Sequence, residues 1–301
     1  MKRRNEMDEF VYEFTKAKGI VVCGDIHGDF TQLVFKCCDQ YGMTDTLIIV
    51  AGDCGFGFER PGYYENIYTK CNKKLSKANN WLLFIRGNHD NPAYFNLQPI
   101  KHRRWMTLPD YSIVKACGHT ILCVGGATSI DRLLRITAKY YHLPNPKEPL
   151  APNVYWNDEQ PYFDKTRLDT INESCAIDTV ITHTSPSFCE LSSHQGLESW
   201  AEHDNTLMFD VQYERKVMDD IQAYLYMKNH PLRYWYYGHF HQSWHAEIDG
   251  VQYNMLDCME LRELRETTCH LVCQGDEGTG TNDTWMMDEG RRLMEDGRGM
   301  M

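Results

Sequence analysis

The sequence predicts an α/β protein, because short apolar runs alternate with segments of helical periodicity along most of its 301 residues. The apolar runs are rich in Val, Ile and aromatic residues, which is typical of strands that are buried on both faces. They cover residues 20–23, 47–51, 82–85, 121–124, 179–181 and 234–237. All but the run at 121–124 lead into a polar side chain that can bind a metal, so we expect these side chains to meet at one edge of a sheet.

Three segments between the predicted strands have the periodicity of amphipathic helices, and they cover residues 30–41, 63–78 and 210–228. One face of the first predicted helix carries Phe30, Leu33, Val34, Cys37 and Tyr41. Near the carboxyl end of the chain, residues 247–253 predict a hairpin with an Asp249-Gly250 turn.

The sequence divides into one large predicted domain, 1–267, and an acidic tail rich in glycine and methionine, 268–301. Residues 275–301 hold seven acidic and three basic residues, so we expect the tail to be loosely ordered. Residues 142–162 contain five prolines and few periodic apolar positions. They predict a long loop, and long loops in compact domains are often functional.

The composition is that of a soluble globular protein, with 42% hydrophobic and 24% charged residues. A net charge of −11 disfavours extended nucleic-acid binding, which depends on many Lys and Arg contacts to phosphate. We see no signal peptide and no run of the ~20 apolar residues that a membrane span needs, so we expect a cytoplasmic protein. Several of the 12 cysteines lie in apolar runs and no two pairs have zinc-finger spacing, so we expect reduced thiols.

Five short motifs carry the chemistry of the sequence. They are Gly24-Asp25-Ile26-His27-Gly28, Gly52-Asp53, Gly87-Asn88-His89-Asp90, Thr182-His183 and Gly238-His239-Phe240-His241. Each fragment alone is typical of a surface turn or a hydrogen-bonded structural histidine. Apart from His89 and Asp90, they offer two carboxylates, one amide oxygen and four imidazoles, which suffice for two divalent cations if one carboxylate bridges them. The adjacent glycines permit tight turns and close approach of a substrate.

This set resembles the calcineurin-like metallophosphoesterase superfamily, whose pattern is GDxHG, GD, GNH[DE], a lone His and GHxH. The resemblance implies a two-sheet β-sandwich flanked by helices, a four-layer α/β/β/α fold. It also implies two metal sites that share Asp53. The first would consist of Asp25, His27, Asp53 and His241, and the second of Asp53, Asn88, His183 and His239. A hydroxide between the metals would attack phosphorus, and His89 would assist the leaving oxygen as the catalytic histidine.

The second motif departs from the serine/threonine phosphatase branch, which carries GDxVDRG. Here Phe56 stands where that branch has the Asp that pairs with the catalytic His. The sequence is closer to bacterial-type phosphoesterases, which often carry a stretch like 125–132 followed by a Trp-x-x-Glu-like segment such as 156–159. Arg132 and Arg135 could bind phosphate oxygens or form surface salt bridges. Asp90 is expected to cap its turn and not to bind metal.

We therefore expect a metal-dependent hydrolase of phosphate mono- or diesters that acts on a phosphorylated small molecule or a nucleotide. Mn²⁺ is the expected metal, and Fe or Zn would also suit the mixed nitrogen and oxygen donors. A nuclease of the same superfamily is the alternative with the same chemistry, which the acidic charge disfavours. A non-catalytic scaffold is the alternative from another class, which the full ligand set disfavours. The sequence leaves the substrate and the oligomeric state open.

Overall fold

The computed structural model describes residues 10–60, 62–141, 155–189 and 196–265. The chain divides into two units, Met1–Glu266 and Thr267–Met301, and every described element lies in the first. The predicted tail at 268–301 and residues 142–154 of the predicted long loop lie outside the described residues. Among the described residues, no helix has the length and apolarity needed to cross a bilayer.

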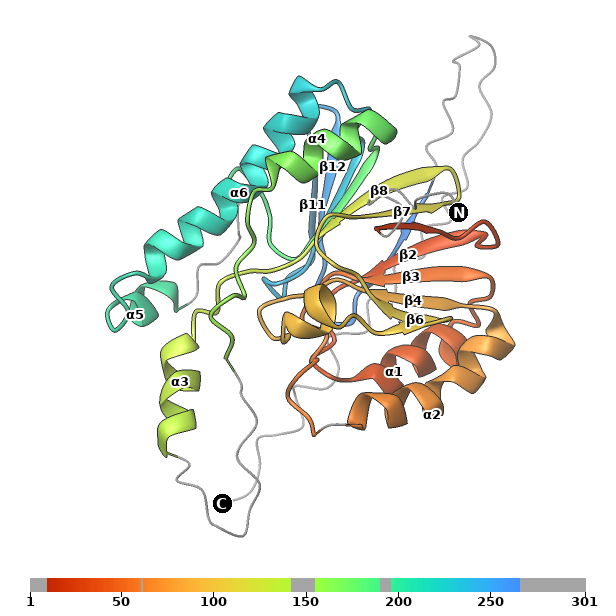
Figure 1. The fold of residues 1–301 in the computed structure, drawn as a ribbon, viewed down its shortest axis with the longest axis horizontal. Helices are drawn as coiled ribbons and strands as arrows, with labels where there is room; N and C mark the ends of the chain where they lie inside the picture. The colour runs from red at the N-terminus through yellow and green to blue at the C-terminus, as the bar shows by residue number, and fades with distance from the viewer. Residues whose placement is uncertain (1–9, 61, 142–154, 190–195, 266–301) are drawn as a thin grey trace, which may run out of the picture. The chain divides into compact units, whose positions relative to one another are not determined.

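The described residues form two mixed β-sheets with helices on their outer faces (Figure 1). The strands are β1 (Val11–Glu13), β2 (Gly19–Cys23), β3 (Thr46–Val50), β4 (Trp81–Phe84), β5 (Lys101–His102), β6 (Trp105–Thr107), β7 (Ser112–Ala116), β8 (His119–Val124), β9 (Thr179–Thr182), β10 (Tyr234–Tyr237), β11 (Trp244–Ile248), β12 (Val251–Met255) and β13 (Leu261–Leu264). The helices are α1 (Phe30–Phe35), α2 (Tyr63–Ala78), α3 (Arg132–Tyr141), α4 (Lys165–Ser174), α5 (Leu197–Ala201) and α6 (Leu207–Met227), with π-helical turns at Lys36–Gln40 and Ala93–Leu97.

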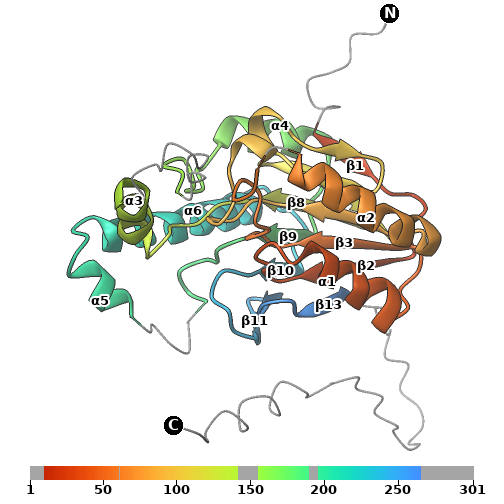
Figure 2. The same cartoon turned by 90° about the horizontal axis from the view of Figure 1, so that it is seen from below.

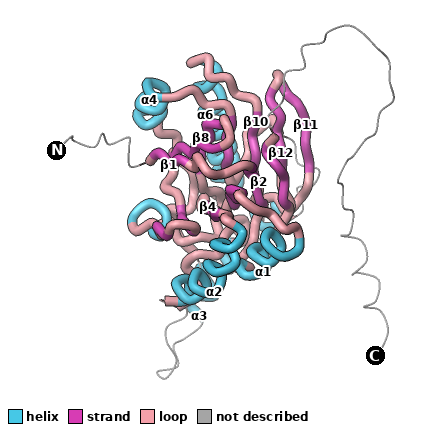
Figure 3. Tube along the Cα trace, turned by 90° about the vertical axis from the view of Figure 1, so that its right-hand side faces the viewer, coloured by secondary structure: helices cyan, strands magenta, loops and turns pink. Residues whose placement is uncertain are grey.

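One sheet has six strands in the order β13-β2-β3-β4-β6-β5, and the other has seven in the order β1-β7-β8-β9-β10-β12-β11. The central strands of each sheet run parallel, β2-β3-β4 in the first and β8-β9-β10-β12 in the second. Helices α1 and α2 lie across the six-stranded sheet, as the view from below shows (Figure 2). Helices α4 and α6 lie on the opposite side, beyond the seven-stranded sheet (Figures 1 and 3). This arrangement confirms the predicted sandwich with helices on both sides.

Three apolar cores separate the four layers, and in the central strands alternate residues belong to different cores. Val21 of β2 packs with α1 and α2, whereas its neighbour Val22 packs between the sheets. In β10, Tyr236 likewise lies between the sheets and Trp235 packs beneath α4 and α6. Because successive side chains of a strand point to opposite faces, a strand covered on both faces must be apolar throughout. This explains the continuous apolar runs of the sequence.

Most of the predicted elements are confirmed, with one change in helix geometry. The predicted helix at 30–41 is α-helical only to Phe35 and continues as a π-helical turn, and Tyr41 is 46% exposed instead of packing on the apolar face. The predicted hairpin is formed by β11 and β12, and its turn residues Asp249 and Gly250 both have positive φ. That conformation is characteristic of the tight turns that Asp-Gly favours.

The expectation that the polar side chains meet at one sheet edge is wrong. Strands β2, β3 and β4 belong to the six-stranded sheet, whereas β9 and β10 belong to the seven-stranded sheet. The carboxyl ends of both parallel sets lie at the same end of the sandwich, so the motifs meet between two sheets. Periodicity within single strands contains no information on which sheet a strand joins, so the strand pattern alone predicted one sheet edge, and only the family resemblance indicated two sheets.

Candidate metal centre

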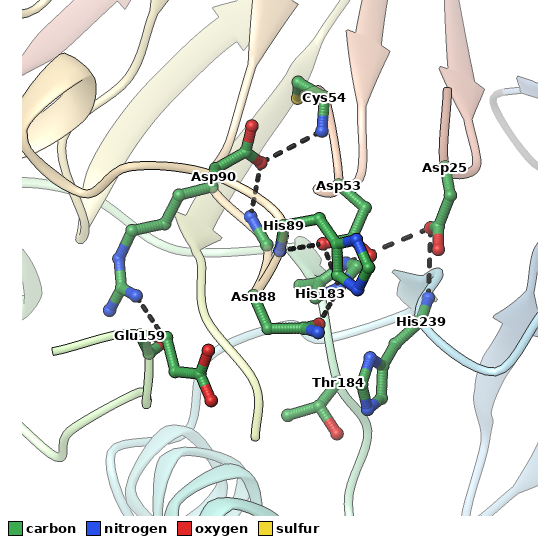
Figure 4. Close-up of polar contacts among 12 residues, drawn as sticks. Asp25, Asp53, Cys54, Asn88, His89, Asp90, Glu159, His183, Thr184 and His239 are labelled. Atoms are coloured by element: carbon green, nitrogen blue, oxygen red, sulfur yellow. Dashed lines mark hydrogen bonds and ion pairs between the residues drawn. The ribbon is translucent and has the colours of Figure 1, made fainter. Parts of the chain in front are cut away.

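The six-stranded sheet supplies the first group of predicted ligands through the loops after its parallel strands (Figure 4). Asp25 follows β2, Asp53 follows β3 and Asn88 follows β4, and all three side chains are buried. The glycine before Asn88 is required by close packing, because a Cβ at Gly87 would overlap Asp53 Oδ1. The glycines beside the ligands therefore allow the ligand loops to pack closely against one another.

Asp90 holds these loops in place. Its buried carboxylate accepts backbone hydrogen bonds from Cys54 (2.9 Å), Gly55 (2.8 Å), Phe56 (2.8 Å) and Gly87 (2.8 Å). The loops after β3 and β4 are thus joined through one side chain, which agrees with the predicted role of Asp90 as a cap.

The seven-stranded sheet supplies the histidines, His183 after β9 and His239 and His241 after β10. His183 is buried, and its Nδ1 lies 2.7 Å from the carbonyl oxygen of Ala51. A hydrogen bond from Nδ1–H to this carbonyl leaves Nε2 with a lone pair, which is the form that binds metal. His239 connects the two sheets, because its backbone N–H donates to Asp25 Oδ1 at 3.0 Å.

The four residues predicted for the first metal lie together. Asp25, His27, Asp53 and His241 each offer one donor atom, and these atoms lie within 4.8 Å of one another. The Nε2 atoms of His27 and His241 are 3.0 Å apart, and His241 Nε2 is 3.1 Å from Asp25 Oδ2.

The predicted second set is brought together as well. His183 Nε2 lies 3.1 Å from Asp53 Oδ1 and 3.1 Å from Asn88 Oδ1. The His183 and His239 rings are neighbours, with centroids 5.0 Å apart. Asp53 contacts members of both sets, which is the position that a bridging carboxylate requires.

The donor set fits divalent cations on the chemistry of its own contacts. Asp25 Oδ2 is fully buried and accepts no hydrogen bond in the described part of the chain, although His241 Nε2 approaches it. His183 Nε2 faces two acceptor oxygens while its Nδ1 faces a third. Buried carboxylates without donors are costly unless a cation balances them. Oxygen and imidazole donors at these separations are the ligands of Zn²⁺, Mn²⁺ or Fe²⁺.

The buried carboxylates also change the pKa values of the neighbouring histidines. Burial lowers the pKa of His183, but the Asp53 carboxylate outweighs it, and the pKa is raised to about 9. Once protonated, His241 can donate to the Asp25 carboxylate, and this interaction raises the pKa of His241 to about 10. Burial lowers the pKa of both His239 and His89, which keeps these imidazoles neutral. The pKa of His27 is raised as well, chiefly by a hydrogen bond with Cys258, so three of the predicted ligands attract protons that a metal must displace.

The backbone is strained at several of these residues. His27, Asp53, His239 and His241 all have positive φ, between 42° and 70°. This conformation is uncommon outside glycine and persists only where the surroundings enforce it, which is typical of functional sites.

Asn88 is oriented by two residues to which the sequence assigned no role. Its Nδ2 donates to Ser129 Oγ at 3.1 Å, so its Oδ1 faces His183. Ser129 in turn donates from Oγ (2.6 Å) and from its backbone N–H (2.7 Å) to the buried carboxylate of Glu159. The buried guanidinium of Arg86 holds the Glu159 backbone in place through its carbonyl (2.5 Å). The only signal in the sequence was the resemblance of 125–132 and 156–159 to a stretch found in bacterial-type relatives.

The two predicted phosphate-binding arginines differ in their surroundings. Arg132 is largely buried and paired with two carboxylates, at 2.5 Å to Asp204 and 2.6 Å to Asp210. These contacts favour the salt-bridge interpretation, because the guanidinium of Arg132 already joins α3 to the start of α6. Arg135 lies beside the predicted catalytic histidine: it contacts His89 Nε2 and pairs with Asp131 at 2.9 Å.

A cavity of about 1130 Å³ opens next to these residues. Asp53, Asn88, His89 and His239 form part of its lining. Its wall also contains apolar side chains from α5, α6 and the loop after β10, namely Leu197, Trp200, Met208, Phe209 and Phe240. Phe209 is 70% exposed, so this wall offers apolar surface to a ligand.

The sequence profile of the calcineurin-like phosphoesterase family matches residues 19–243, which include the seven predicted ligands and His89. The chain therefore belongs to the calcineurin-like phosphoesterase family, as its motifs indicated. Membership supports a hydrolase that acts on phosphate esters.

No curated protein matches the chain. Among solved structures, it is similar to the protein TT1561 of Thermus thermophilus, with 13% identity, a TM-score of 0.40, and coverage of 82% of this chain and 98% of that one. It is also similar to a putative 5′-nucleotidase from Staphylococcus aureus in complex with alpha-ketoglutarate (11%, TM-score 0.41, coverage 81% and 50%). A third is the phosphopantetheinyl hydrolase PptH of Mycobacterium tuberculosis (14%, TM-score 0.33, coverage 87% and 99%). These similarities are too low to carry an argument about substrate.

Ser129→Ala should weaken metal binding, because Asn88 loses the hydrogen bond that turns its amide oxygen toward His183. Loss of such a supporting contact typically costs about 10-fold to 100-fold in metal affinity. Titration of the chelated protein with Mn²⁺ or Zn²⁺ measures the change. Ser174→Ala is the matched control, because that hydroxyl bonds to helix carbonyls and to the neighbouring Cys175 thiol. Equal affinities for the Ser129 variant and the wild type would contradict the orienting role.

Metal affinity should rise with pH between 7 and 9. The raised pKa values of His183 and His241 mean that both carry protons at pH 7, and these protons must leave when a metal binds. Calorimetry at pH 7 in two buffers of different ionisation enthalpy should show roughly two to three protons released per protein, because the pKa of the predicted ligand His27 is raised as well. His241→Ala should reduce the number of released protons by about one. His102→Ala should leave it unchanged, because the His102 ring stacks on Tyr68 away from the predicted ligands. A metal affinity that is constant over this pH range would oppose the expectation.

Proposed function

We propose that this chain is a metal-dependent phosphoesterase that hydrolyses phosphate mono- or diesters. The observation that carries the proposal is that Asp53, which is buried, lies within 4.8 Å of the donor atoms of Asp25, His27 and His241 and 3.1 Å from His183, while Asn88 and His239 contact or adjoin His183. These residues come from loops of two different sheets. When bound, two divalent cations would supply a nucleophilic water at neutral pH and neutralise charge on the phosphoryl group. All seven predicted ligands keep their assigned roles in this proposal.

His89 and Arg135 serve the reacting phosphate from the protein side. His89 lines the cavity, and its backbone N–H donates to Asp53 Oδ1 at 2.7 Å, which fixes it beside the centre. Its neutral imidazole can stabilise the leaving oxygen by donating a hydrogen bond from its ring N–H. Arg135 places a permanent positive charge beside it, where it can contact the phosphoryl oxygens.

The cavity indicates the kind of substrate. Its volume suits a ligand well beyond inorganic phosphate in size, and its apolar wall on α5 and α6 suits an aromatic or alkyl group. A phosphorylated small molecule or a nucleotide with such a group fits this arrangement. The net charge of −11 gives no support to extended nucleic-acid binding.

The metal-loaded protein should hydrolyse an aryl phosphate or a bis-aryl phosphate, and His89→Ala should reduce kcat by roughly 10²-fold to 10⁴-fold. The assay uses the chelated protein reloaded with Mn²⁺, Zn²⁺ or Fe²⁺, and Asp53→Asn serves as the variant that loses metal. Labelled single- and double-stranded DNA tests the nuclease alternative in the same assay. Bound metal without turnover of any aryl ester, nucleotide or DNA would refute the proposal and favour a scaffold.

Phe209→Ala should raise KM for aryl phosphates and leave kcat nearly unchanged. The exposed ring lines the cavity and contributes apolar contact, which is worth about 1.5–3 kcal/mol for a fully buried side chain and less for this partly covered one. Met227→Ala on the same helix is the control, because Met227 is 65% exposed and does not line the cavity. If Phe209→Ala has the same KM as the wild type for both aryl and small alkyl phosphates, the apolar wall does not contact the substrate.

A further inference from the structure

A thiol lies beside the first predicted metal site. The donor atoms of His27, His241 and Cys258 all lie within 4.8 Å of one another. Cys258 belongs to neither the family motifs nor a strand, since it lies in the connection between β12 and β13. Two donor atoms that bind one ion at about 2.0–2.3 Å are roughly 3–4 Å apart, so a small movement brings the sulfur into the ligand sphere.

The segment that carries Cys258 is fixed against the centre by its backbone. Met259 N–H donates to the carbonyl of Asp25 at 2.9 Å, and Gly24 N–H donates to the carbonyl of Glu260 at 3.0 Å. Asp257 N–H donates to the Glu260 carboxylate at 2.9 Å. These bonds tie the segment to the loop that holds Asp25. The thiol is therefore held next to the centre and does not reach it by chance mobility of a loop.

A second observation points to a cation at the same place. Asp25 Oδ2 is fully buried, accepts no hydrogen bond within the described residues, and lies 3.1 Å from His241 Nε2 and 3.9 Å from His27 Nε2, the two imidazoles that neighbour Cys258. His27 and His241 therefore adjoin both the buried Asp25 carboxylate and the Cys258 thiol, so one cation could contact all of these groups. Cys175, which is also free and partly exposed, contacts a helix carbonyl and a serine.

We propose that Cys258 is a further ligand of the first metal, completing a mixed nitrogen, oxygen and sulfur site that prefers Zn²⁺ to Mn²⁺. The inference rests on the proposed function, because it assumes that His27 and His241 bind metal. Thiolate donors favour zinc over manganese, whereas a site of carboxylates and imidazoles alone accepts either. The preference would replace the sequence-based expectation of manganese for this site.

Cobalt(II) spectroscopy tests the inference on the full-length protein. The wild type, Cys258→Ser and the control Cys175→Ser are chelated, reloaded with Co²⁺ and scanned from the near ultraviolet to the visible. Wild type and Cys175→Ser should show a sulfur-to-cobalt charge-transfer band together with visible ligand-field bands. Cys258→Ser should lose the charge-transfer band and keep the visible bands, because the other ligands still hold the ion. Thiols elsewhere in the chain would give a band that persists in Cys258→Ser.

The outcomes separate the two proposals. Visible cobalt bands without charge transfer in the wild type, or a charge-transfer band that survives Cys258→Ser, would overturn the role of Cys258 and leave the phosphoesterase intact. No cobalt bands in any protein would overturn both. A competition between Zn²⁺ and Mn²⁺ gives a second readout: the ratio of bound zinc to manganese should fall at least about tenfold in Cys258→Ser, since a direct ligand matters no less than a supporting contact. An unchanged ratio would also overturn the inference.

Discussion

The burial of the Asp53 carboxylate between two sheets is the constraint on which the rest of the site depends. Asp53 is 2% exposed, and Asp25 close by is completely buried. Two carboxylates in such surroundings are stable only with positive charge beside them. The chain provides it through imidazoles from the opposite sheet, and a pair of cations would provide it more strongly. The contact between the two sheets at this end of the sandwich is therefore an electrostatic contact as much as an apolar one.

The backbone of the ligand loops keeps the carboxylates of one sheet and the imidazoles of the other in fixed positions, despite the attraction between them. Positive φ at four predicted ligands and the four N–H donors on Asp90 fix the loops in a conformation that local propensity does not favour. The three apolar cores supply the stability that compensates this strain, because they cover both faces of each sheet. A rigid sandwich with strained loops at one end keeps the ligand positions fixed before any ion binds.

Sequence alone predicted the features that repeat in short windows. The buried strands are visible as apolar runs, and motifs such as Gly52-Asp53 and Gly87-Asn88 are visible because close packing demands glycine next to a ligand. Features that depend on distant segments were not visible. Ser129 lies 41 residues along the chain from Asn88, and Glu159 lies another 30 residues beyond it, so nothing in their local sequence indicates that they meet. Arg132 resembled a phosphate ligand until its partners, Asp204 and Asp210, were known.

The two halves of the centre also differ in their access to solvent. The His27 and His241 side chains are 35% and 49% exposed, whereas that of His183 is completely buried. An ion held by the exposed imidazoles can exchange with solvent directly, while one held near His183 would be reached from the cavity that Asp53, Asn88 and His239 line. A site that exchanges freely is the one where an added ligand has the largest effect on which metal is retained. That asymmetry explains why a cysteine beside His27 and His241 would matter chemically, because it would add a ligand to the half of the centre whose imidazoles are the more exposed.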